Sequence, residues 1–273
     1  MKTAFSTIGC PDWGFKEIYA AAKDLGFDGI EIRGIEKDLY APSIPFFSPE
    51  QIEKTKVMFT GALKISCLSS GACLGLGKEQ DTEAVEEARA YLDLADALDV
   101  PFVRVLISAA AYPLEADLNL GLNRYRTVCD YALEKGIKAL PLIETNGVLA
   151  DSAVMRGFIE KTDRPNAGAL WDINHPYRYF GEKVEDTAKN LGGFIKYMHV
   201  KDSHMDGGRL EYRVMGYGDM PVYDALKAAA QTGFDGYVSL EWVKRWLPDL
   251  QDPGVVFSHY YSYITYLFRM LSK

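Results

Sequence analysis

The chain has 273 residues, of which 48% are hydrophobic and 25% are charged, and its formal net charge is −8. This length suits one large α/β barrel or two smaller domains, and the acidic balance, without any Lys/Arg-rich run, argues against a nucleic-acid partner. The sequence has no apolar run long enough to span a membrane and no signal-peptide pattern at its start, so we expect a cytoplasmic protein.

Short apolar runs alternate with stretches of helical spacing along the whole chain. In Thr82–Leu98, for example, Ala88, Leu92 and Ala95 recur at intervals of three or four positions, and acidic residues occupy the opposite face. The eight runs that we predict to be strands are Ala4–Ile8, Gly29–Ile32, Leu63–Leu68, Phe102–Ile107, Ile137–Glu144, Ala167–Asp172, Phe194–His199 and Tyr237–Glu241.

The order of these elements predicts one barrel. Gly26, Gly136 and Gly233 lie where a left-handed residue ends a helix before the next strand. Eight strand–helix units, with strands apolar on both faces and no flexible linker, predict an α/β fold of the (β/α)₈ TIM-barrel type, as a single domain over residues 1–273. Pro141 lacks an amide donor inside the fifth run, so we expect a local bulge there.

The four cysteines do not form a recognisable redox or zinc motif. They lack CxxC spacing and lie mostly in or beside apolar runs. We therefore expect reduced structural thiols at the positions Cys10, Cys67, Cys73 and Cys129.

One chemically active side chain ends each of the last four runs. These residues are Glu144, Asp172, His199 and Glu241. In a parallel barrel the carboxyl ends of neighbouring strands meet at one rim, where catalytic groups lie. Any one of them alone would be interpreted as a solvated strand end or a core histidine, but four on consecutive strands predict a divalent-cation site.

Two glutamates on either side of such a cation suit chemistry at a carbon next to a carbonyl group. The cation polarises the oxygen, one carboxylate removes the adjacent proton, and the second returns a proton from the other face. We therefore expect Glu144 and Glu241 to be catalytic, in an isomerase or epimerase that acts on a keto-sugar or ketose phosphate through a metal-stabilised enediolate.

The sequence around these residues resembles a known family. LIETN at Glu144, WDINH at Asp172, MHVKD at His199, MGYGD at Gly216 and SLEW at Glu241 resemble motifs of the xylose isomerase-like sugar phosphate isomerase/epimerase superfamily of TIM barrels. The resemblance implies that Glu144, Asp172, His199 and Glu241 bind one divalent cation. We expect Mn²⁺ in first place, with Mg²⁺, Co²⁺ or Zn²⁺ as alternatives.

Further residues are candidates for substrate binding. The resemblance implies that His175 binds a substrate oxygen; a loop histidine held by Pro176 is the alternative. Lys201 is a candidate for binding a hydroxyl or phosphate group, with Asp202 orienting it or His199, although a surface ion pair would explain both equally well. Gly216 and Gly218 form either a simple turn or a turn that presents amides to a ligand, before a helix from about Pro221.

Other side chains are candidates for the walls of the site. Asn146 follows Glu144 closely in LIETN, and Arg209 and Arg213 are the nearest substitutes for an arginine that ketose 3-epimerases of the superfamily carry where this chain has Met205. In the loops after the early strands the candidate wall residues are Trp13, Glu31, Arg33, Phe46, Phe47 and Arg104.

Two other functions remain open at this point. One is a metal-dependent dehydratase of an inosose-like or dehydroshikimate-like ketone, and the other is a barrel that binds a sugar without catalysis. A trinuclear-zinc nuclease of the same barrel type is disfavoured, because the third and fourth strands lead into Ser69, Ser70 and Ser108 and offer no histidine. The aromatic stretch SHYYSYITYLFRML predicts a last barrel helix with part of its surface buried in a homo-oligomer, a dimer or tetramer.

Overall fold

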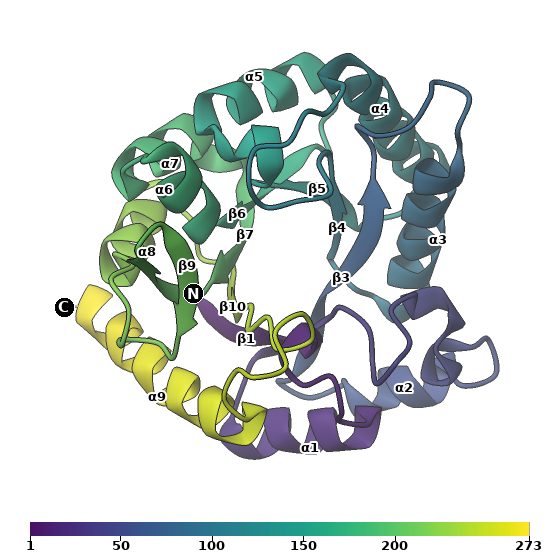
Figure 1. Ribbon diagram of the computed structural model, residues 1–273. Coiled ribbons are helices and arrows are strands. Elements are labelled where there is room, and N and C mark those ends of the chain that lie inside the picture. The colour runs from purple at the N-terminus through teal and green to yellow at the C-terminus, as the bar shows by residue number, and fades with distance from the viewer. Residues whose placement is uncertain (273) are drawn as a thin grey trace.

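The computed structural model describes residues 1–272 and forms a closed barrel of eight parallel strands, as the sequence predicts. Figure 1 views the barrel along its axis, with the helices in a ring outside the strands. The strands follow the order β1-β10-β7-β6-β5-β4-β3-β2 around the barrel. Their bounds are β1 Lys2–Ser6, β2 Gly29–Ile32, β3 Lys64–Cys73, β4 Phe102–Leu106, β5 Leu140–Glu144, β6 Gly168–Asp172, β7 Ile195–Val200 and β10 Tyr237–Leu240.

The helices of the outer ring connect successive strands. Thr82–Leu98 is confirmed as α3, which begins after the N-cap residue Thr82, and the helix expected near Pro221 is α8. The bounds are α1 Phe15–Leu25, α2 Ile52–Met58, α3 Glu83–Leu98, α4 Leu118–Lys135, α5 Ser152–Thr162, α6 Asn174–Phe180, α7 Val184–Leu191, α8 Val222–Gln231 and α9 Pro253–Leu271.

Glycine ends several of these helices as the sequence predicts. Gly26 and Gly136 are the left-handed C-cap residues of α1 and α4, with φ of 86° and 70°. Gly233 follows α8 with φ of 86°. A residue without a Cβ adopts this conformation at little steric cost, so each helix turns back to the next strand within a few residues.

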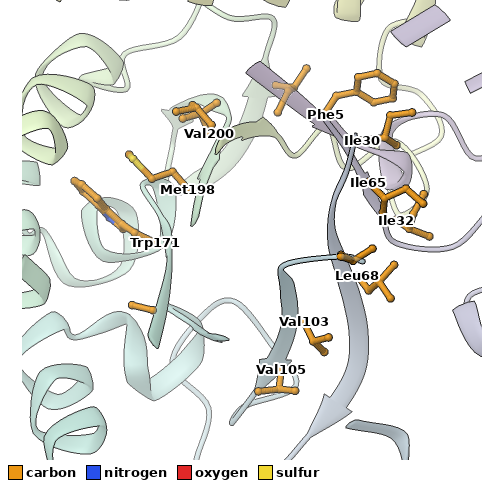
Figure 2. Packing of buried hydrophobic residues seen from close by; sticks show 14 of the residues in the cluster. Phe5, Ile30, Ile32, Ile65, Leu68, Val103, Val105, Trp171, Met198 and Val200 are labelled. Atoms are coloured by element: carbon orange, nitrogen blue, oxygen red, sulfur yellow. The ribbon is translucent and has the colours of Figure 1, made fainter. Parts of the chain in front are cut away.

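Two apolar layers hold the barrel together. The larger layer lies between the strands and the helices, and Figure 2 shows Phe5, Ile30, Val103 and Trp171 among its buried residues. The smaller layer consists of Ala4, Cys67, Leu142, Leu170, Tyr197 and Tyr237 and comes from six different strands. Because every strand is covered on both faces, its sequence is apolar almost throughout.

Pro141 lies in β5 without the bulge that we expected. It pairs with Val103 in a continuous register between β4 and β5. The amide of the preceding residue, Leu140, donates to the carbonyl oxygen of Pro101, which directly precedes β4. Because successive backbone nitrogens of a strand point to opposite sides, the nitrogen of Pro141 faces β6. Pairing with β6 starts only at Leu142, and the missing donor therefore interrupts no ladder bond.

A two-stranded antiparallel hairpin follows β7 and was missed in the sequence. It consists of β8 Asp202–Asp206 and β9 Arg209–Arg213. Its strands are short and polar, so they lack the apolar run that identifies a barrel strand. The available signal was Asp206-Gly207-Gly208, because both glycines have positive φ, 53° and 87°, as tight hairpin turns require.

All four cysteines are free thiols, as expected from their spacing. Burial raises the pKa of Cys73 to about 11 and that of Cys129 to about 12, which leaves little reactive thiolate at neutral pH. Among residues 1–272, no helix combines the length and the hydrophobicity that a membrane span requires.

The packing of α3 gives a prediction about stability. Leu92 is fully buried on the inner face of α3, whereas Glu83 is exposed at its start. We expect Leu92→Ala to lower the free energy of unfolding by about 2–5 kcal/mol, because it removes buried methyl groups and leaves a cavity. The surface variant Glu83→Ala should change it by less than about 0.5 kcal/mol. Urea unfolding of both variants tests this; equal effects would contradict the packing described for this face.

Candidate metal centre

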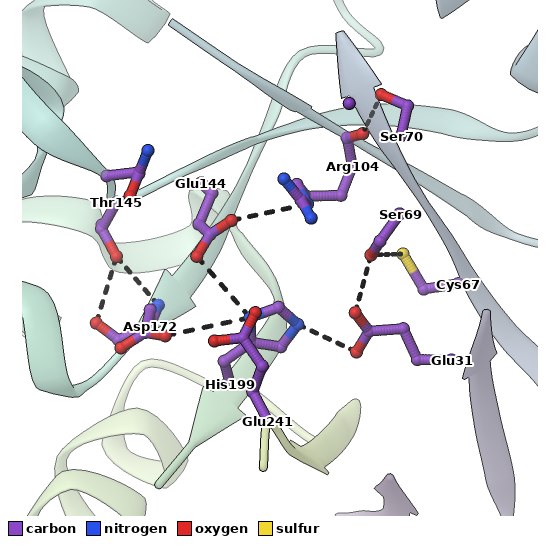
Figure 3. A network of polar contacts seen from close by, with 12 residues as sticks. Glu31, Cys67, Ser69, Ser70, Arg104, Glu144, Thr145, Asp172, His199 and Glu241 are labelled. Atoms are coloured by element: carbon purple, nitrogen blue, oxygen red, sulfur yellow. Dashed lines mark hydrogen bonds and ion pairs between the residues drawn. The ribbon is translucent and has the colours of Figure 1, made fainter. Parts of the chain in front are cut away.

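The barrel brings Glu144, Asp172, His199 and Glu241 together at the carboxyl ends of its strands. Glu144 ends β5, Asp172 ends β6 directly opposite His199 of β7, and Glu241 follows β10. One ligand atom from each lies within 4.8 Å of the others. All four side chains are buried, and Figure 3 shows them pointing toward one another.

The free polar atoms at this point fit a divalent cation. Nδ1 of His199 lies 3.7 Å from Glu144 Oε1, 3.9 Å from Asp172 Oδ2 and 3.6 Å from Glu241 Oε1. This nitrogen is buried and has no hydrogen-bond partner among the described residues, whereas Asp172 Oδ2 forms an ion pair with Lys201. Three carboxylates and one imidazole form a donor set that Mn²⁺ and related ions accept.

Asp172 is oriented by the start of α6. Its Oδ1 accepts the amides of Asn174 and His175, at 2.8 and 3.3 Å. The hydroxyl of Thr145 accepts the amide of Asp172 at 2.8 Å. The amide hydrogen bonds occupy one carboxylate oxygen, and the other oxygen, Oδ2, faces His199 and the ammonium group of Lys201.

His199 is held by Glu31, a residue that we expected only as part of the cavity wall. Nε2 of His199 donates to Glu31 Oε2 at 2.9 Å, so Nδ1 faces the cluster (Figure 3). Glu31 also accepts the hydroxyls of Ser69 at 2.6 Å and Ser239 at 2.8 Å. Burial alone would raise the pKa of the Glu31 carboxyl, but His199 and the hydroxyls lower it to about 2.

Burial and charge also set the ionisation of two ligands. Burial would raise the pKa of Glu144, but the nearby Arg104 guanidinium and His199 hold it well below its usual range. Burial would lower the pKa of His199, whereas the Glu31 and Glu241 carboxylates raise it well above its usual value. A bound cation would oppose this last effect, because coordination requires the neutral imidazole.

Asp202 does not orient His199 or Lys201, which corrects one of our expectations. Its carboxylate accepts the amides of Gly216 at 2.8 Å, Gly218 at 2.9 Å and Met220 at 3.2 Å. The two glycine amides are therefore occupied within the protein and are not presented to a ligand. The simple-turn interpretation of this segment is correct, and the turn joins the hairpin to α8.

Lys201 is buried against two of the four cluster residues. Its ammonium group forms ion pairs with the carboxylates of Asp172 and Glu241, and only 1% of the residue is exposed. Burial would lower its pKa, but the two carboxylates raise it well above its usual value. The surface ion pair that we considered is therefore wrong, because this charge neutralises part of the buried cluster.

A cavity of about 430 Å³ lies over the cluster, a size suited to a small ligand. His175 and Asn146 lie in its wall: Nδ1 of His175 bonds Thr145 O at 2.8 Å, and Nδ2 of Asn146 donates to Ser108 O at 2.8 Å. Nε2 of His175 lies 3.6 Å from Asp172 Oδ2. The full lining is Ile8, Arg33, Arg104, Leu106, Ala109, Ala111, Glu144, Asn146, His175, Lys201, Tyr212, Glu241, Val243, Trp246 and Leu247.

Several candidate wall residues lie outside this lining. Trp13 packs edge-on against Phe257, with ring centroids 5.7 Å apart, and Arg209 is exposed at the tip of the hairpin. Phe46 and Phe47 pack against the ring of Phe15, the first residue of α1. Tyr212, Val243, Trp246 and Leu247 lie in the wall instead, and no sequence pattern distinguishes them from ordinary loop residues.

Comparisons with known proteins identify similar chains of the same fold. Fructoselysine 3-epimerase of Escherichia coli O157:H7 is 22% identical over 258 residues, which cover 90% of this chain and 92% of that protein. The crystal structure of the IOLI protein with a bound zinc atom has a TM-score of 0.80 at 17% identity, over 98% of this chain and 99% of that one. The probable 3-DHS dehydratase AsbF of Bacillus anthracis has a TM-score of 0.77 at 18% identity, over 97% and 99%.

The family model described as xylose isomerase-like TIM barrel matches residues 19–256. This range runs from α1 to the first turn of α9 and includes all four residues of the candidate centre. The chain therefore belongs to the xylose isomerase-like TIM barrel family.

Proposed function

We propose that the protein is a divalent-metal-dependent isomerase or epimerase that acts on a keto-sugar or a ketose phosphate. The observation that carries the proposal is the convergence of Glu144, Asp172, His199 and Glu241 within 4.8 Å, beside a cavity that Glu144 and Glu241 line. The similarity to fructoselysine 3-epimerase supports the isomerase class. When bound, the ion, Mn²⁺ by preference, would polarise a carbonyl oxygen and stabilise negative charge on it.

Glu144 and Glu241 would transfer the proton. Both carboxylates line the cavity, and β6 and β7 lie between β5 and β10 in the barrel, so the glutamates approach a ligand from separate sides. The lowered pKa of Glu144 keeps its carboxylate ionised at neutral pH and able to accept a proton from the carbon next to the carbonyl. Glu241, in its protonated form, would give its proton to the other face of the enediolate, which inverts the configuration at that carbon. Glu144 then holds the abstracted proton, which exchanges with water before the next turnover.

The neighbouring polar residues would hold the substrate. Nδ1 of His175 is bonded to Thr145 O, so its Nε2 is left to face substrate oxygens from the cavity wall. Lys201 and Asn146 would contact hydroxyl groups from the same wall. Trp246, Leu247 and Val243 form an apolar part of the lining that would exclude water from the reacting carbon. We also propose a cytoplasmic protein that assembles as a homo-oligomer.

Metal binding gives the first test of this proposal. Asp172→Asn removes the charge of one ligand while it preserves size, so we expect the affinity for Mn²⁺ to fall at least tenfold. Titration calorimetry of metal-free protein with Mn²⁺ measures this. Asp93→Asn, a half-exposed carboxylate on α3, is the matched control and should bind as the natural protein does. Equal affinities in both variants would contradict a metal site at Asp172.

Glu31 gives a second test that leaves all four ligands in place. Because the Glu31 carboxylate fixes the orientation of His199, we expect Glu31→Gln to weaken Mn²⁺ binding about 10- to 100-fold. Glu182→Gln replaces another hydrogen-bonded carboxylate, one that accepts the amide and the hydroxyl of Ser152 and belongs neither to the centre nor to the cavity lining, and serves as the control. Unchanged affinity in Glu31→Gln would contradict a contribution of the Glu31 carboxylate to metal binding.

Catalysis is tested by proton exchange. We expect the Mn²⁺-loaded protein to place deuterium at carbon when it is incubated with a panel of ketoses and ketose phosphates in D₂O, and EDTA to abolish this. Glu144→Gln and Glu241→Gln should each lower the rate about 10²- to 10⁴-fold at saturating Mn²⁺. The surface variant Glu160→Gln on α5 should retain full activity. Loss of water in place of exchange would indicate a dehydratase, and the absence of both would indicate a sugar-binding barrel.

A further inference from the structure

Two arginine side chains line the cavity without a role in proton transfer. Arg33 directly follows β2 and is half-buried, and Arg104 lies on β4 with only 4% of the residue exposed. Both belong to the same wall of residues that includes Glu144 and Glu241. Two guanidinium groups therefore reach the space above the candidate metal centre.

Neither guanidinium group is satisfied by the protein. Nε of Arg104 lies 3.5 Å from Glu144 Oε2, which is an ion pair without a hydrogen bond, and this buried nitrogen has no hydrogen-bond partner (Figure 3). Within residues 1–272, the guanidinium of Arg33 forms neither a hydrogen bond nor an ion pair. Arg124, by contrast, donates to four backbone carbonyl oxygens.

Two guanidinium groups with unused N–H donors in one cavity cost free energy when no ligand is bound. Arg33 and Arg104 line the same cavity, and Arg104 is almost fully buried. Burial, and then the like charge of Arg104, lower the pKa of Arg33. Buried charges normally have partners, because an unpaired charge loses its hydration. Lys201 already has two carboxylate partners, so Arg33 and Arg104 are the cations of this cavity with donors to spare.

The chemistry of the guanidinium group indicates what the partner is. Its planar fork of N–H donors matches the two oxygens of a carboxylate or of a phosphate. Nε of Arg104 is near a carboxylate oxygen of the metal centre itself, so the bound anionic group would lie within the same small molecule that reaches the centre. Glu144 would still bind the metal ion. The N–H groups of Arg33 and Arg104 that have no partner in the protein are then left for the anionic group of the ligand.

We infer that the substrate is an anionic keto-sugar, one that carries a carboxylate or a phosphate group, and that Arg33 and Arg104 bind this group. This inference rests on the proposed function and narrows its substrate to an anionic class. A neutral ketose that covers the cavity would leave Arg33 without an anionic partner, and would leave Arg104 with the 3.5 Å ion pair to Glu144 but with unused N–H donors. The anionic group also fixes the orientation of the sugar relative to Glu144 and Glu241.

Binding of unreactive polyols to the Mn²⁺-loaded protein tests the inference. D-Glucitol, D-glucitol 6-phosphate and D-gluconate share a six-carbon chain, lack a ketone, and differ in charge. We expect titration calorimetry to show at least tenfold tighter binding of one of the two anions than of D-glucitol. The tighter anion distinguishes phosphate from carboxylate as the group recognised. Equal affinity for all three polyols would overturn the inference.

Variants assign the preference to the two arginines. We expect Arg33→Gln and Arg104→Gln each to reduce the affinity for the preferred anion about tenfold and to leave that for D-glucitol within about twofold. Arg156→Gln, on the surface of α5, should retain the full preference. Arg104 is buried, so thermal unfolding must show that its variant is folded; Arg33→Gln, with a half-exposed side chain, gives an independent result. An anion preference that survives in both variants would overturn the assignment.

These measurements separate the inference from the proposed function. Polyol binding requires no proton transfer, so an arginine-dependent anion preference without deuterium exchange on any ketose phosphate or keto-sugar acid would contradict the isomerase function alone. Exchange on neutral ketoses, with no anion preference, would support the function and overturn the inference.

Discussion

The buried carboxylates at the carboxyl end of the barrel are the constraint on which the rest of the site depends. Glu31, Glu144, Asp172 and Glu241 are all at most 8% exposed. Four such charges within one barrel would repel each other strongly and lose their hydration, so they persist only with positive partners nearby. His199 lies within 3.9 Å of all four acids, Lys201 pairs with Asp172 and Glu241, and Arg104 pairs with Glu144. A divalent cation at the centre would supply the remaining positive charge.

The barrel separates this polar cluster from the apolar part of its interior. The smaller apolar layer fills the barrel interior with Leu142, Leu170, Tyr197 and Tyr237 among its residues, and Tyr197 bonds Ser66 through its hydroxyl at 2.9 Å. Tyr197 also lies edge-on to His199, with ring centroids 5.9 Å apart, where the two regions meet. Packing of this layer fixes the strands, and the strands fix the directions of the side chains at their ends.

Hydrogen bonds from neighbouring residues fix the orientations of the side chains and loops of the site. Glu31 fixes His199, the start of α6 fixes Asp172, and Asp202 closes the turn that leads into α8. Arg178 of α6 donates to Ser203 Oγ at 2.8 Å and to its carbonyl oxygen at 2.7 Å, which ties the hairpin to the barrel. The hairpin in turn carries Tyr212 into the cavity wall. The candidate site is thus built from strand ends but is positioned by loops.

The sequence by itself determined the barrel, its eight strands, α3 and the four residues of the candidate centre. Eight apolar runs that alternate with segments of helical spacing are typical of a (β/α)₈ barrel. The parallel topology of that barrel brings the carboxyl ends of consecutive strands to the same rim. For Glu144, Asp172, His199 and Glu241, position along the chain was therefore enough to predict proximity.

The tertiary structure alone decided which other residues serve the site. Glu31 bonds His199 across 168 positions of sequence, and β2 and β7 are not neighbours in the barrel, so no local pattern relates them. The polar hairpin lacked an apolar run, Asp202 turned away from His199, and Trp13 packed on Phe257 instead of lining the cavity. Such choices depend on the direction in which each side chain leaves the backbone once the barrel has closed, and the order of residues along the chain does not contain that direction.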